Sequence, residues 1–253
     1  MRRVLASVSL LVFAASGQAE WKILSAESEP GRAGIEHRHI VLENTAADQR
    51  ADVDVAIFSP KSCTLRVIDN PDGQTLAATM KHEKCACAVN GGYFDEEFAP
   101  IGLRIVNEQT VAPLRRARLI TGVLLESTRG VQIMRAREFS RSHKIAAAIQ
   151  CGPFLVDASQ RIGGLNDSQR ARRTFAATAT NERVLLGVCS EVSLANLAQI
   201  LAKTPLAAGS KIDRALNLDG GSSSAFWFAR ENGNALSIPG QKPVRDFVAV
   251  VPR

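Results

Sequence analysis

The sequence predicts an α+β fold: a single domain built on a mixed, mostly antiparallel β-sheet core with a few flanking helices. Short apolar and β-branched runs recur along the chain, Gly, Asn, Asp and Pro turns separate them, and only two segments have a helical pattern. The chain has 253 residues, of which 45% are hydrophobic and 22% charged, as in ordinary globular proteins. Since no repeat, low-complexity tract or linker divides it, we expect one domain.

The N-terminus has the pattern of a secretory signal peptide. Arg2 and Arg3 precede an apolar run, residues 4–15, and Gly17-Gln18-Ala19 offers small residues for cleavage after Ala19. We expect a signal peptide over residues 1–19, a domain over residues 20–253, and an exported protein, periplasmic or secreted. The run is shorter than the ~20 residues of a spanning helix, and no later run approaches that length, so no integral membrane segment is expected after cleavage.

Strand patterns dominate the rest of the chain. A hairpin is predicted from residues 174–180, the turn Asn181-Glu182 and residues 183–188. His37 and His39 are expected on an exposed strand, in a first third that carries no motif. The other predicted strands cover residues 53–58, 64–68, 86–89, 101–106, 119–125, 131–134, 145–149 and 247–251.

Two segments predict helices. Residues 74–81 follow an Asp72-Gly73 turn. Residues 193–202 make the stronger pattern, because Ser193 can cap the N-terminus and Pro205 lies just beyond the end. Its apolar face consists of Leu194, Leu197, Ile200 and Leu201.

The charge pattern argues against a nucleic-acid partner. The net charge is +6, and the densest basic run, Leu114-Arg115-Arg116-Ala117-Arg118, is not accompanied by stacking aromatics, since the chain has one Tyr and two Trp. We expect this run to be a solvated loop or strand face. A weakly basic surface suits an anionic substrate, although it does not specify one.

The five cysteines predict disulfides in an exported protein, with at least one thiol left over. The expected pairs are Cys63–Cys85 and Cys151–Cys189. Cys85-x-Cys87 has no matching second pair of ligands, so a cysteine metal site is not expected. No metal and no cofactor is assigned.

Two double-glycine segments carry the chemistry. Asn217-Leu218-Asp219-Gly220-Gly221, followed by three serines, reads as a loop between apolar strands, and Asn90-Gly91-Gly92-Tyr93 follows the strand at 86–89. Paired glycines let a ligand approach main-chain N–H groups, and a neighbouring carboxylate supplies an acid or base. Each segment alone is also compatible with a simple turn.

Together these segments resemble the phosphodiester glycosidase family. Three further stretches fit the family's pattern in the same order along the chain: Gln150-Cys151-Gly152-Pro153, Arg172-Arg173-Thr174, and Pro243-Val244-Arg245-Asp246-Phe247-Val248. The resemblance covers roughly residues 86–253. It implies hydrolysis of a sugar-1-phosphodiester or related envelope glycan at the C1–O bond, with an α+β fold.

The resemblance implies a catalytic set of Asp219, Asn90, Arg173 and Thr174. Asp219 is assigned as nucleophile or general base, with orientation of sugar hydroxyls as the alternative. Asn90 would hold substrate hydroxyls or the attacking water, and Arg173 and Thr174 would bind phosphate, with Arg172 as a substitute for Arg173. Adjacent strand residues face opposite sides, so Arg173 and Thr174 can share a site only if the strand is bulged or begins after them.

Other matching residues are assigned to substrate binding, with the glycines offering backbone amides to phosphate. The segment Phe175-Ala176-Ala177 departs from the family's pattern, which lowers the weight of the neighbouring assignments. The substrate-binding set is Gly91, Gly92, Tyr93, Gln150, Asn217, Gly220, Gly221, Ser222 and Arg245.

Alternatives stay open at this stage. Asp95, Glu96 and Glu97 could supply a second carboxylate or a calcium ligand, although a solvated loop is expected. The serines do not form a Gly-x-Ser-x-Gly elbow, and Cys151 has no neighbouring His, so neither is expected to be a nucleophile. The main functional alternative is a catalytically silent glycan- or phosphosugar-binding module, and a metal-dependent phosphodiesterase lacks a convincing ligand set.

Overall fold

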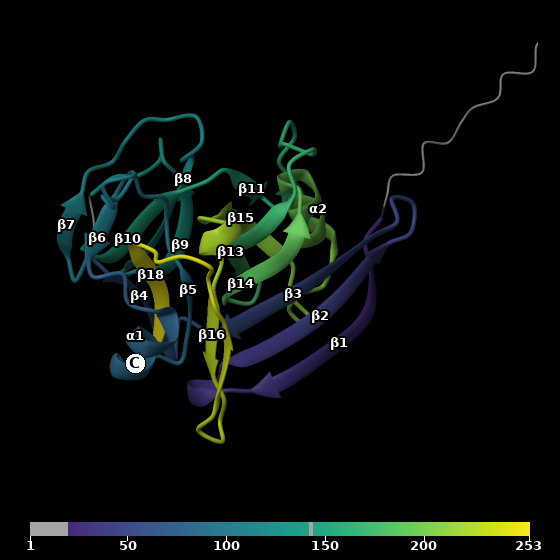
Figure 1. Cartoon of the computed structure of the whole chain (residues 1–253), viewed down its shortest axis with the longest axis horizontal. Helices are drawn as coiled ribbons and strands as arrows, with labels where there is room; N and C mark the ends of the chain where they lie inside the picture. Colours follow the sequence, from purple (N-terminus) through teal and green to yellow (C-terminus); the bar gives the residue numbers. More distant parts are fainter. Residues whose placement is uncertain (1–19, 142–143) are drawn as a thin grey trace, which may run out of the picture.

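The computed structural model describes residues 20–141 and 144–253. The predicted signal peptide, residues 1–19, lies outside the described residues. The described strands form three β-sheets, accompanied by two α-helices (Figure 1). The predicted antiparallel sheet is confirmed. The prediction that the sheet is mixed is wrong, because every strand pair in the described part is antiparallel.

The largest sheet has eight strands and curves across one half of the molecule (Figure 1). In spatial order it contains β1 (Lys22–Pro30), β2 (Glu36–Asn44), β3 (Gln49–Phe58), β14 (Arg183–Val192), β13 (Ala171–Ala179), β15 (Ile212–Asn217), β11 (Phe154–Asp157) and β12 (Gln160–Arg161).

Two five-stranded sheets form the other half. One contains β7 (Gln109–Ala112), β6 (Arg104–Val106), β10 (Ile145–Cys151), β8 (Gly122–Ser127) and β9 (Gly130–Arg135). The other contains β17 (Ala235–Ile238), β16 (Phe226–Ala229), β5 (Cys87–Asn90), β18 (Asp246–Pro252) and β4 (Cys63–Asp69).

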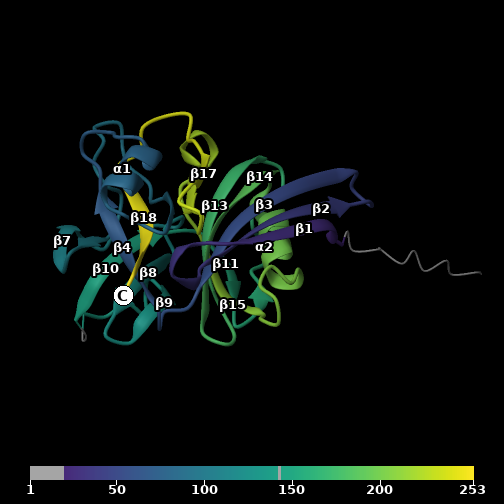
Figure 2. The ribbon, with the colours of Figure 1, turned by 90° about the horizontal axis from the view of Figure 1, so that it is seen from below.

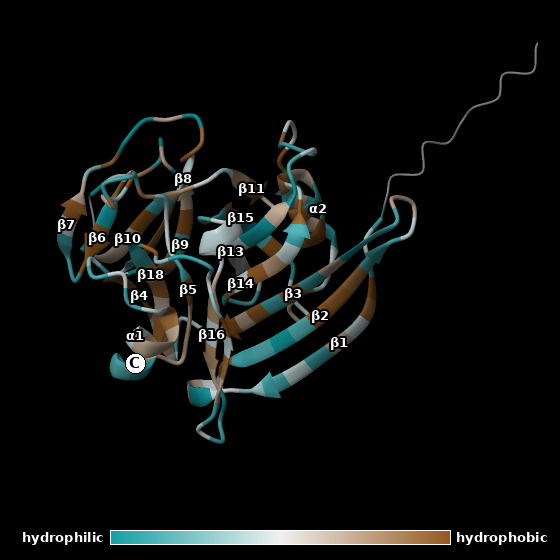
Figure 3. Ribbon diagram, in the orientation of Figure 1, coloured by the Kyte–Doolittle hydropathy of each residue, from teal (hydrophilic) through white to brown (hydrophobic). Residues whose placement is uncertain are grey.

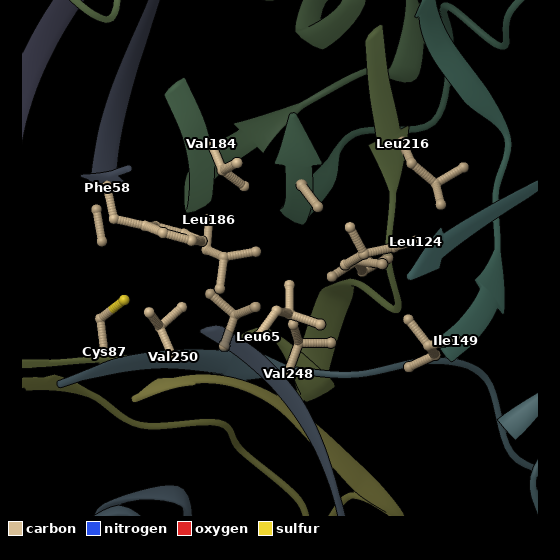
Figure 4. Close-up of a cluster of buried hydrophobic side chains, with 14 of the residues drawn as sticks. Phe58, Leu65, Cys87, Leu124, Ile149, Val184, Leu186, Leu216, Val248 and Val250 are labelled. Atoms are coloured by element: carbon tan, nitrogen blue, oxygen red, sulfur yellow. The ribbon is translucent and has the colours of Figure 1, made fainter. Parts of the chain in front are cut away.

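A continuous apolar cluster lies where the three sheets meet. Each sheet contributes alternate residues of its strands to this cluster, as the period of two in a strand requires. Figure 4 shows these side chains converging from strands far apart in the sequence, and Figure 3 shows the hydrophobic character of those strands. The labelled members are Phe58, Leu65, Cys87, Leu124, Ile149, Val184, Leu186, Leu216, Val248 and Val250.

The second helix covers the opposite face of the eight-stranded sheet. Helix α2 (Leu194–Lys203) packs there with Phe175 and Leu185 in a separate apolar cluster (Figure 2). As predicted, Ser193 caps it: its Oγ accepts a hydrogen bond from the Asn196 N–H at 3.1 Å.

The first helix is shorter than α2 and packs on the outer face of the β5–β18 sheet. Helix α1 (Leu76–His82) buries Leu76 and Met80 in a third cluster. Thr75 caps it through a hydrogen bond from the Ala78 N–H at 3.3 Å. Its predicted position, residues 74–81, is therefore confirmed, although the helix begins two residues later and ends one residue later than predicted.

The expectation of an exposed strand at the histidines is half wrong. His37 and His39 do lie on a strand, β2, but only 4% of His37 is exposed. Its Nδ1 lies 3.0 Å from Glu29 Oε1 and its Nε2 3.1 Å from Asp54 Oδ1. The strand is covered because β1 and β3 flank it and the β16 aromatic rings lie against His37.

Neither expected disulfide is formed, since all five cysteines are free and buried. The predicted partners belong to different apolar clusters. Cys63 and Cys85 lie in the first and third, and Cys151 and Cys189 in the first and second. A sheet therefore separates the two thiols of each predicted pair, and the predictions of these pairs are wrong for this structure. In the described part of the chain, no helix has the length and apolar character needed to cross a membrane.

Candidate active site

The two double-glycine segments meet at the ends of β5 and β15. These strands belong to different sheets, yet the Asp219 N–H donates to the Gly91 carbonyl at 3.0 Å. The predicted loop between strands is confirmed: β15 ends at Asn217, a short 3₁₀ turn spans Gly221–Ser223, and β16 follows. Sequence positions about 130 residues apart therefore form one polar cluster.

Asn90 is the centre of this cluster and is fully buried. Its Nδ2 donates to the Asp219 carbonyl at 2.7 Å, while its Oδ1 accepts from Thr174 Oγ1 at 2.7 Å and from the Ala225 N–H at 3.0 Å. These bonds connect β13 to the loop between β15 and β16. In this structure the amide of Asn90 thus positions the backbone that carries Asp219.

The Asp219 carboxylate is half-buried and lies at the rim of the cluster. Its Oδ1 accepts a hydrogen bond from the Gly220 N–H at 2.9 Å. Burial raises the pKa of Asp219; the nearby Asp246 also raises it, whereas Lys242 and the hydrogen bonds lower it. A partly desolvated carboxylate that holds its proton more strongly than usual is suited to proton transfer.

A buried ion pair supports the first double-glycine segment. Arg104 Nε lies 2.5 Å from Asp246 Oδ2, and both side chains are 1% exposed. Asp246 Oδ1 accepts from the Gly92 N–H at 2.8 Å, and the Asp246 carbonyl accepts from the Gly91 N–H at 2.9 Å. A Cβ on Gly91 would overlap Asp246 Oδ1, and a Cβ on Gly92 would overlap Arg104 Nη2.

Arg173 and Thr174 lie on opposite faces of β13. The register of β13 against β14 shifts between Ala171 and Arg173, so the predicted bulge occurs, but it places Arg172 out of register instead of bringing the two side chains together. Thr174 Oγ1 points to Asn90, whereas Arg173 Nε and Nη2 donate to the carbonyls of Val192 and Gln169 at 3.0 and 2.7 Å.

Arg173 is a buried cation without a carboxylate partner among the described residues. Desolvation by burial lowers the pKa of its guanidinium, while Tyr93 and Cys189 act in the opposite direction. A Cβ placed on Gly220 would lie 3.9 Å from Arg173 Cδ and 2.9 Å from the Arg172 carbonyl oxygen. The arginine stem therefore packs beside the residue that follows Asp219.

Tyr93 and Asn217 add two polar side chains next to the end of β15. The Tyr93 hydroxyl donates to the Gly152 carbonyl at 2.7 Å, and Asn217 Nδ2 lies 3.1 Å from that hydroxyl. Burial raises the pKa of Tyr93, so the phenol stays protonated. Burial also raises the pKa of Cys151 to about 12, which argues against a nucleophilic thiol at neutral pH.

The remaining predicted substrate ligands are placed less directly. Gln150 is buried, with Oε1 accepting from the N–H groups of Leu103 and Arg115 and Nε2 donating to the carbonyls of Arg115 and Ile120. Arg245 is bound by both oxygens of Asp69. Ser222 and Gly221 lie at the partly exposed turn, where the Gly221 φ of 62° requires a left-handed conformation. Contact of these residues with substrate stays a prediction.

Sequence reasoning missed the Arg104–Asp246 pair. Asp246 stood inside a quoted motif stretch, and Arg104 interrupted an apolar strand run, which was the available signal for a buried charge. The alternative carboxylates are less well placed: Asp95, Glu96 and Glu97 are exposed, and Asp95 Oδ1 accepts from the Ala99 N–H at 2.7 Å. Over residues 20–141 and 144–253, no cluster of three His, Cys, Asp or Glu side chains suits a metal ion.

Known proteins resemble this chain in family, in fold and over part of the sequence. The family model described as phosphodiester glycosidase matches residues 83–251. The catalytic domain of zebrafish N-acetylglucosamine-1-phosphodiester alpha-N-acetylglucosaminidase, auto-inhibited by its pro-peptide, has a similar fold, with a TM-score of 0.67 at 14% identity over 90% of this chain and 88% of that chain. A hypothetical protein from Synechocystis gives a TM-score of 0.62 at 15% identity, covering 87% of this chain and 62% of that one.

A sequence relative is the uncharacterized protein YigE of Escherichia coli strain K12, which is 34% identical over 89 residues. This match spans 32% of the present chain and 35% of the relative. The structural neighbours share the fold at low identity, whereas the family model covers most of the chain, from before β5 into β18. The chain belongs to the phosphodiester glycosidase family.

Proposed function

We propose that the protein is an exported hydrolase that cleaves the glycosidic C1–O bond of a sugar-1-phosphodiester. The observation that carries the proposal is the half-buried carboxylate of Asp219, whose pKa burial raises. The stem of Arg173 packs beside the next residue, Gly220, and the buried Arg173 guanidinium has no carboxylate partner in the described part of the chain. A phosphate would supply the missing negative charge, since a guanidinium matches its oxygens in geometry and charge.

In the proposed reaction, ionised Asp219 either attacks the anomeric carbon, giving a glycosyl–Asp219 ester that water then hydrolyses, or removes a proton from a water that attacks the anomeric carbon directly. The C1–O bond breaks, and its electron pair leaves on the phosphate oxygen. Because a phosphomonoester is already a good leaving group, cationic stabilisation by Arg173 would contribute more than a strong general acid. The two roles of Asp219 differ in the anomer released, which NMR of the first-formed sugar distinguishes.

The sugar-binding side is proposed to lie between the 3₁₀ turn and the loop at residues 239–243. A cavity of about 260 Å³ is lined there by Ser223, Gln241 and Lys242, among others. Lys242 also acts electrostatically on Asp219, which supports a position next to the reacting carboxylate. Since the zebrafish enzyme of similar fold is named for N-acetylglucosamine-1-phosphodiester, N-acetylglucosamine is the sugar of the first substrates to be tested. Export is proposed from the pattern of residues 1–19 alone.

The test is turnover of UDP-N-acetylglucosamine and of a methyl N-acetylglucosamine-1-phosphate diester, with free sugar and phosphomonoester assayed separately. Asp219→Asn should reduce turnover by about a thousandfold or more, because the reacting carboxylate is lost. The exposed Asp213→Asn variant is the charge-matched control and should retain full activity. If folded wild-type protein binds both diesters but releases no sugar, the enzyme is excluded for these substrates and the silent binding module is favoured.

A further inference from the structure

A second cavity lies outside the proposed reacting groups. The loop that arches from β7 to β8 contributes Leu114, Arg115 and Arg116, and the segment after β9 contributes Arg137 and Phe139 (Figure 1). The cavity has a volume of about 640 Å³. This size is within the range of small-molecule sites and would accept a short run of sugar-phosphate or glycerol-phosphate units.

The cavity carries uncompensated positive charge. Arg115, Arg116 and Arg137 are exposed, and in the part of the chain that the structure describes none of their side chains forms an ion pair. Arg135 differs, because it lies 2.7 Å from Asp157 Oδ2 and over the Phe154 ring. Three neighbouring guanidinium groups repel one another, so the cavity favours a ligand with several negative charges.

The strand register places this cavity at the same end of the sheet as the candidate active site. Gly122, the first residue of β8, pairs with Arg135 at the end of β9 and with Cys151 at the end of β10. The next residue, Gly152, accepts hydrogen bonds from Tyr93 and Asn217 within the site. Gly152 also lies against the Leu119 carbonyl of the loop, so the cavity is next to this side of the site.

Gln150 connects the two regions. Its side chain bonds both the N–H and the carbonyl of Arg115, at 3.0 and 2.6 Å, and it stands next to Cys151 at the end of β10. The loop backbone at Arg115 is thus held in place in the folded protein, which fixes where the Arg115 side chain begins. This gives a positioning role to a residue assigned to substrate binding from sequence.

We propose that this cavity is the subsite for the alcohol portion of the substrate, and that this portion is a polyanionic chain whose units are joined by phosphodiesters. The inference rests on the proposed function. Leu114 and Leu119 are also exposed on the loop, which raises the alternative of a lipid surface. We favour the chain because the arginines line a hollow, where guanidinium forks can surround successive phosphates.

The test measures binding of a fluorescent poly(glycerol phosphate) oligomer to catalytically inactive Asp219→Asn protein. The triple variant Arg115→Gln, Arg116→Gln, Arg137→Gln should weaken binding about tenfold or more, because charge-assisted bonds are removed. Raising the salt from about 50 to about 200 mM should weaken wild-type binding and affect the variant less. The control replaces three other exposed arginines without ion pairs in the described part, Arg129, Arg161 and Arg183, and should bind like wild type.

Each other outcome overturns the inference. If the control variant loses as much oligomer affinity as the triple variant, binding reflects general surface charge. If the wild-type protein does not bind the oligomer, there is no such subsite. Binding to phosphatidylglycerol vesicles but not to the oligomer would indicate a lipid-binding surface. Turnover of the methyl diester by the active form of each triple variant separates the two proposals. Its absence in all forms counts against the glycosidase, whereas normal turnover without oligomer binding counts only against this subsite.

Discussion

Gly91 and Gly92 show at the residue scale that a motif glycine can serve packing as well as a ligand. Both are buried, and the space where their side chains would lie is filled by Asp246 and Arg104. The ion pair is enclosed, with Asp246 receiving hydrogen bonds from Arg104 Nε and the Gly92 N–H. The absence of a Cβ is therefore required by the buried pair itself.

Gly92→Ala is expected to destabilise the protein by about 3 kcal/mol, because the new methyl group would displace Arg104 from a buried charge. Chemical denaturation with urea, followed by circular dichroism, measures this change. Gly163→Ala is the matched control: Gly163 is exposed and has no atom within 4 Å of the added Cβ. Its free energy of unfolding should stay within about 0.5 kcal/mol of wild type, and equal losses in both variants would refute the packing argument.

Lys242 provides a residue-scale test of the electrostatics at Asp219. Burial raises the pKa of Asp219, and Lys242 partly opposes this effect. If ionised Asp219 is the active form, activity falls as the pH drops through that raised pKa. Lys242→Gln removes a charge that favours the ionised form, so the acid limb of the kcat/KM profile should move to higher pH.

The matched control for this prediction is Lys211→Gln, which removes an exposed lysine at the end of the loop that precedes β15. Its acid limb should coincide with that of wild type. A Lys242→Gln profile that moves to lower pH, or one that moves equally in both variants, would mean that Asp219 is not the group that titrates.

At the scale of elements, the sequence identifies most strands of the core because their hydrophobic period is visible locally. Residues 183–188 and 247–251, for example, lie within β14 and β18. β1 was missed because its residues are nearly all exposed, and its pairing is defined by β2. The Arg104–Asp246 pair was missed for a related reason: it joins residues 142 positions apart, and no local period reports such a contact.

The candidate site was predicted in part for the same physical reason. Turn chemistry marks Asn90 and Asp219 at the ends of apolar runs, and both lie in the polar cluster. Strand geometry predicts that Arg173 and Thr174 face opposite sides, but the sequence could not reveal whether a bulge brings them together, because the bulge depends on pairing with β14. Nor could it separate Gln150, which bonds two loop segments, at Leu103 and at Arg115 and Ile120, from a ligand-binding amide.

The cap of α2 gives an element-scale prediction. Ser193 Oγ accepts from the Asn196 N–H and donates to Asp167 Oδ1 at 2.8 Å, and Ser193 is fully buried. Ser193→Ala should cost about 1–2 kcal/mol of unfolding free energy, because both bonds are lost in a buried place. Thr75→Ala, at the exposed cap of α1, is the comparison and should cost about 0.5–1 kcal/mol. The reverse order, measured by urea unfolding, would contradict this account.

At the scale of the whole molecule, an ionic cluster joins the edge of the large sheet to the β16–β17 hairpin. Glu29 on β1 accepts from Arg230 Nε at 2.6 Å and lies 3.0 Å from His37 on β2. Asp54 on β3 contacts His37 and also His39, each at 3.1 Å. The His37 ring lies 5.5 and 5.2 Å from the Phe226 and Phe228 rings, so the cluster links two sheets.

This cluster should make the protein sensitive to acid. Hydrogen bonding to Arg230 lowers the pKa of Glu29. Burial acts to raise the pKa of Asp54, but hydrogen bonds with His37 and His39 outweigh burial, so the pKa of Asp54 is also lowered. A lowered pKa in the folded state means that the carboxylate stabilises the fold above its unfolded pKa, and that this contribution is lost as pH falls through the folded pKa. The loss should therefore begin near the usual Asp value of 3.8 and continue below it.

Asp54→Asn tests this linkage directly. At pH 7 the variant should be less stable by about 2 kcal/mol, because buried His37 loses a charged hydrogen-bond partner. Its free energy of unfolding should also fall less steeply than that of wild type as the pH is lowered through the acid range, since one linked carboxylate is absent. Urea unfolding at a series of pH values measures both effects, with exposed Asp213→Asn as control. Parallel pH profiles for wild type and Asp54→Asn would show that the acid sensitivity arises elsewhere. The contact between the two sheets would then depend on packing of the β16 rings against His37 and not on the charge of Asp54.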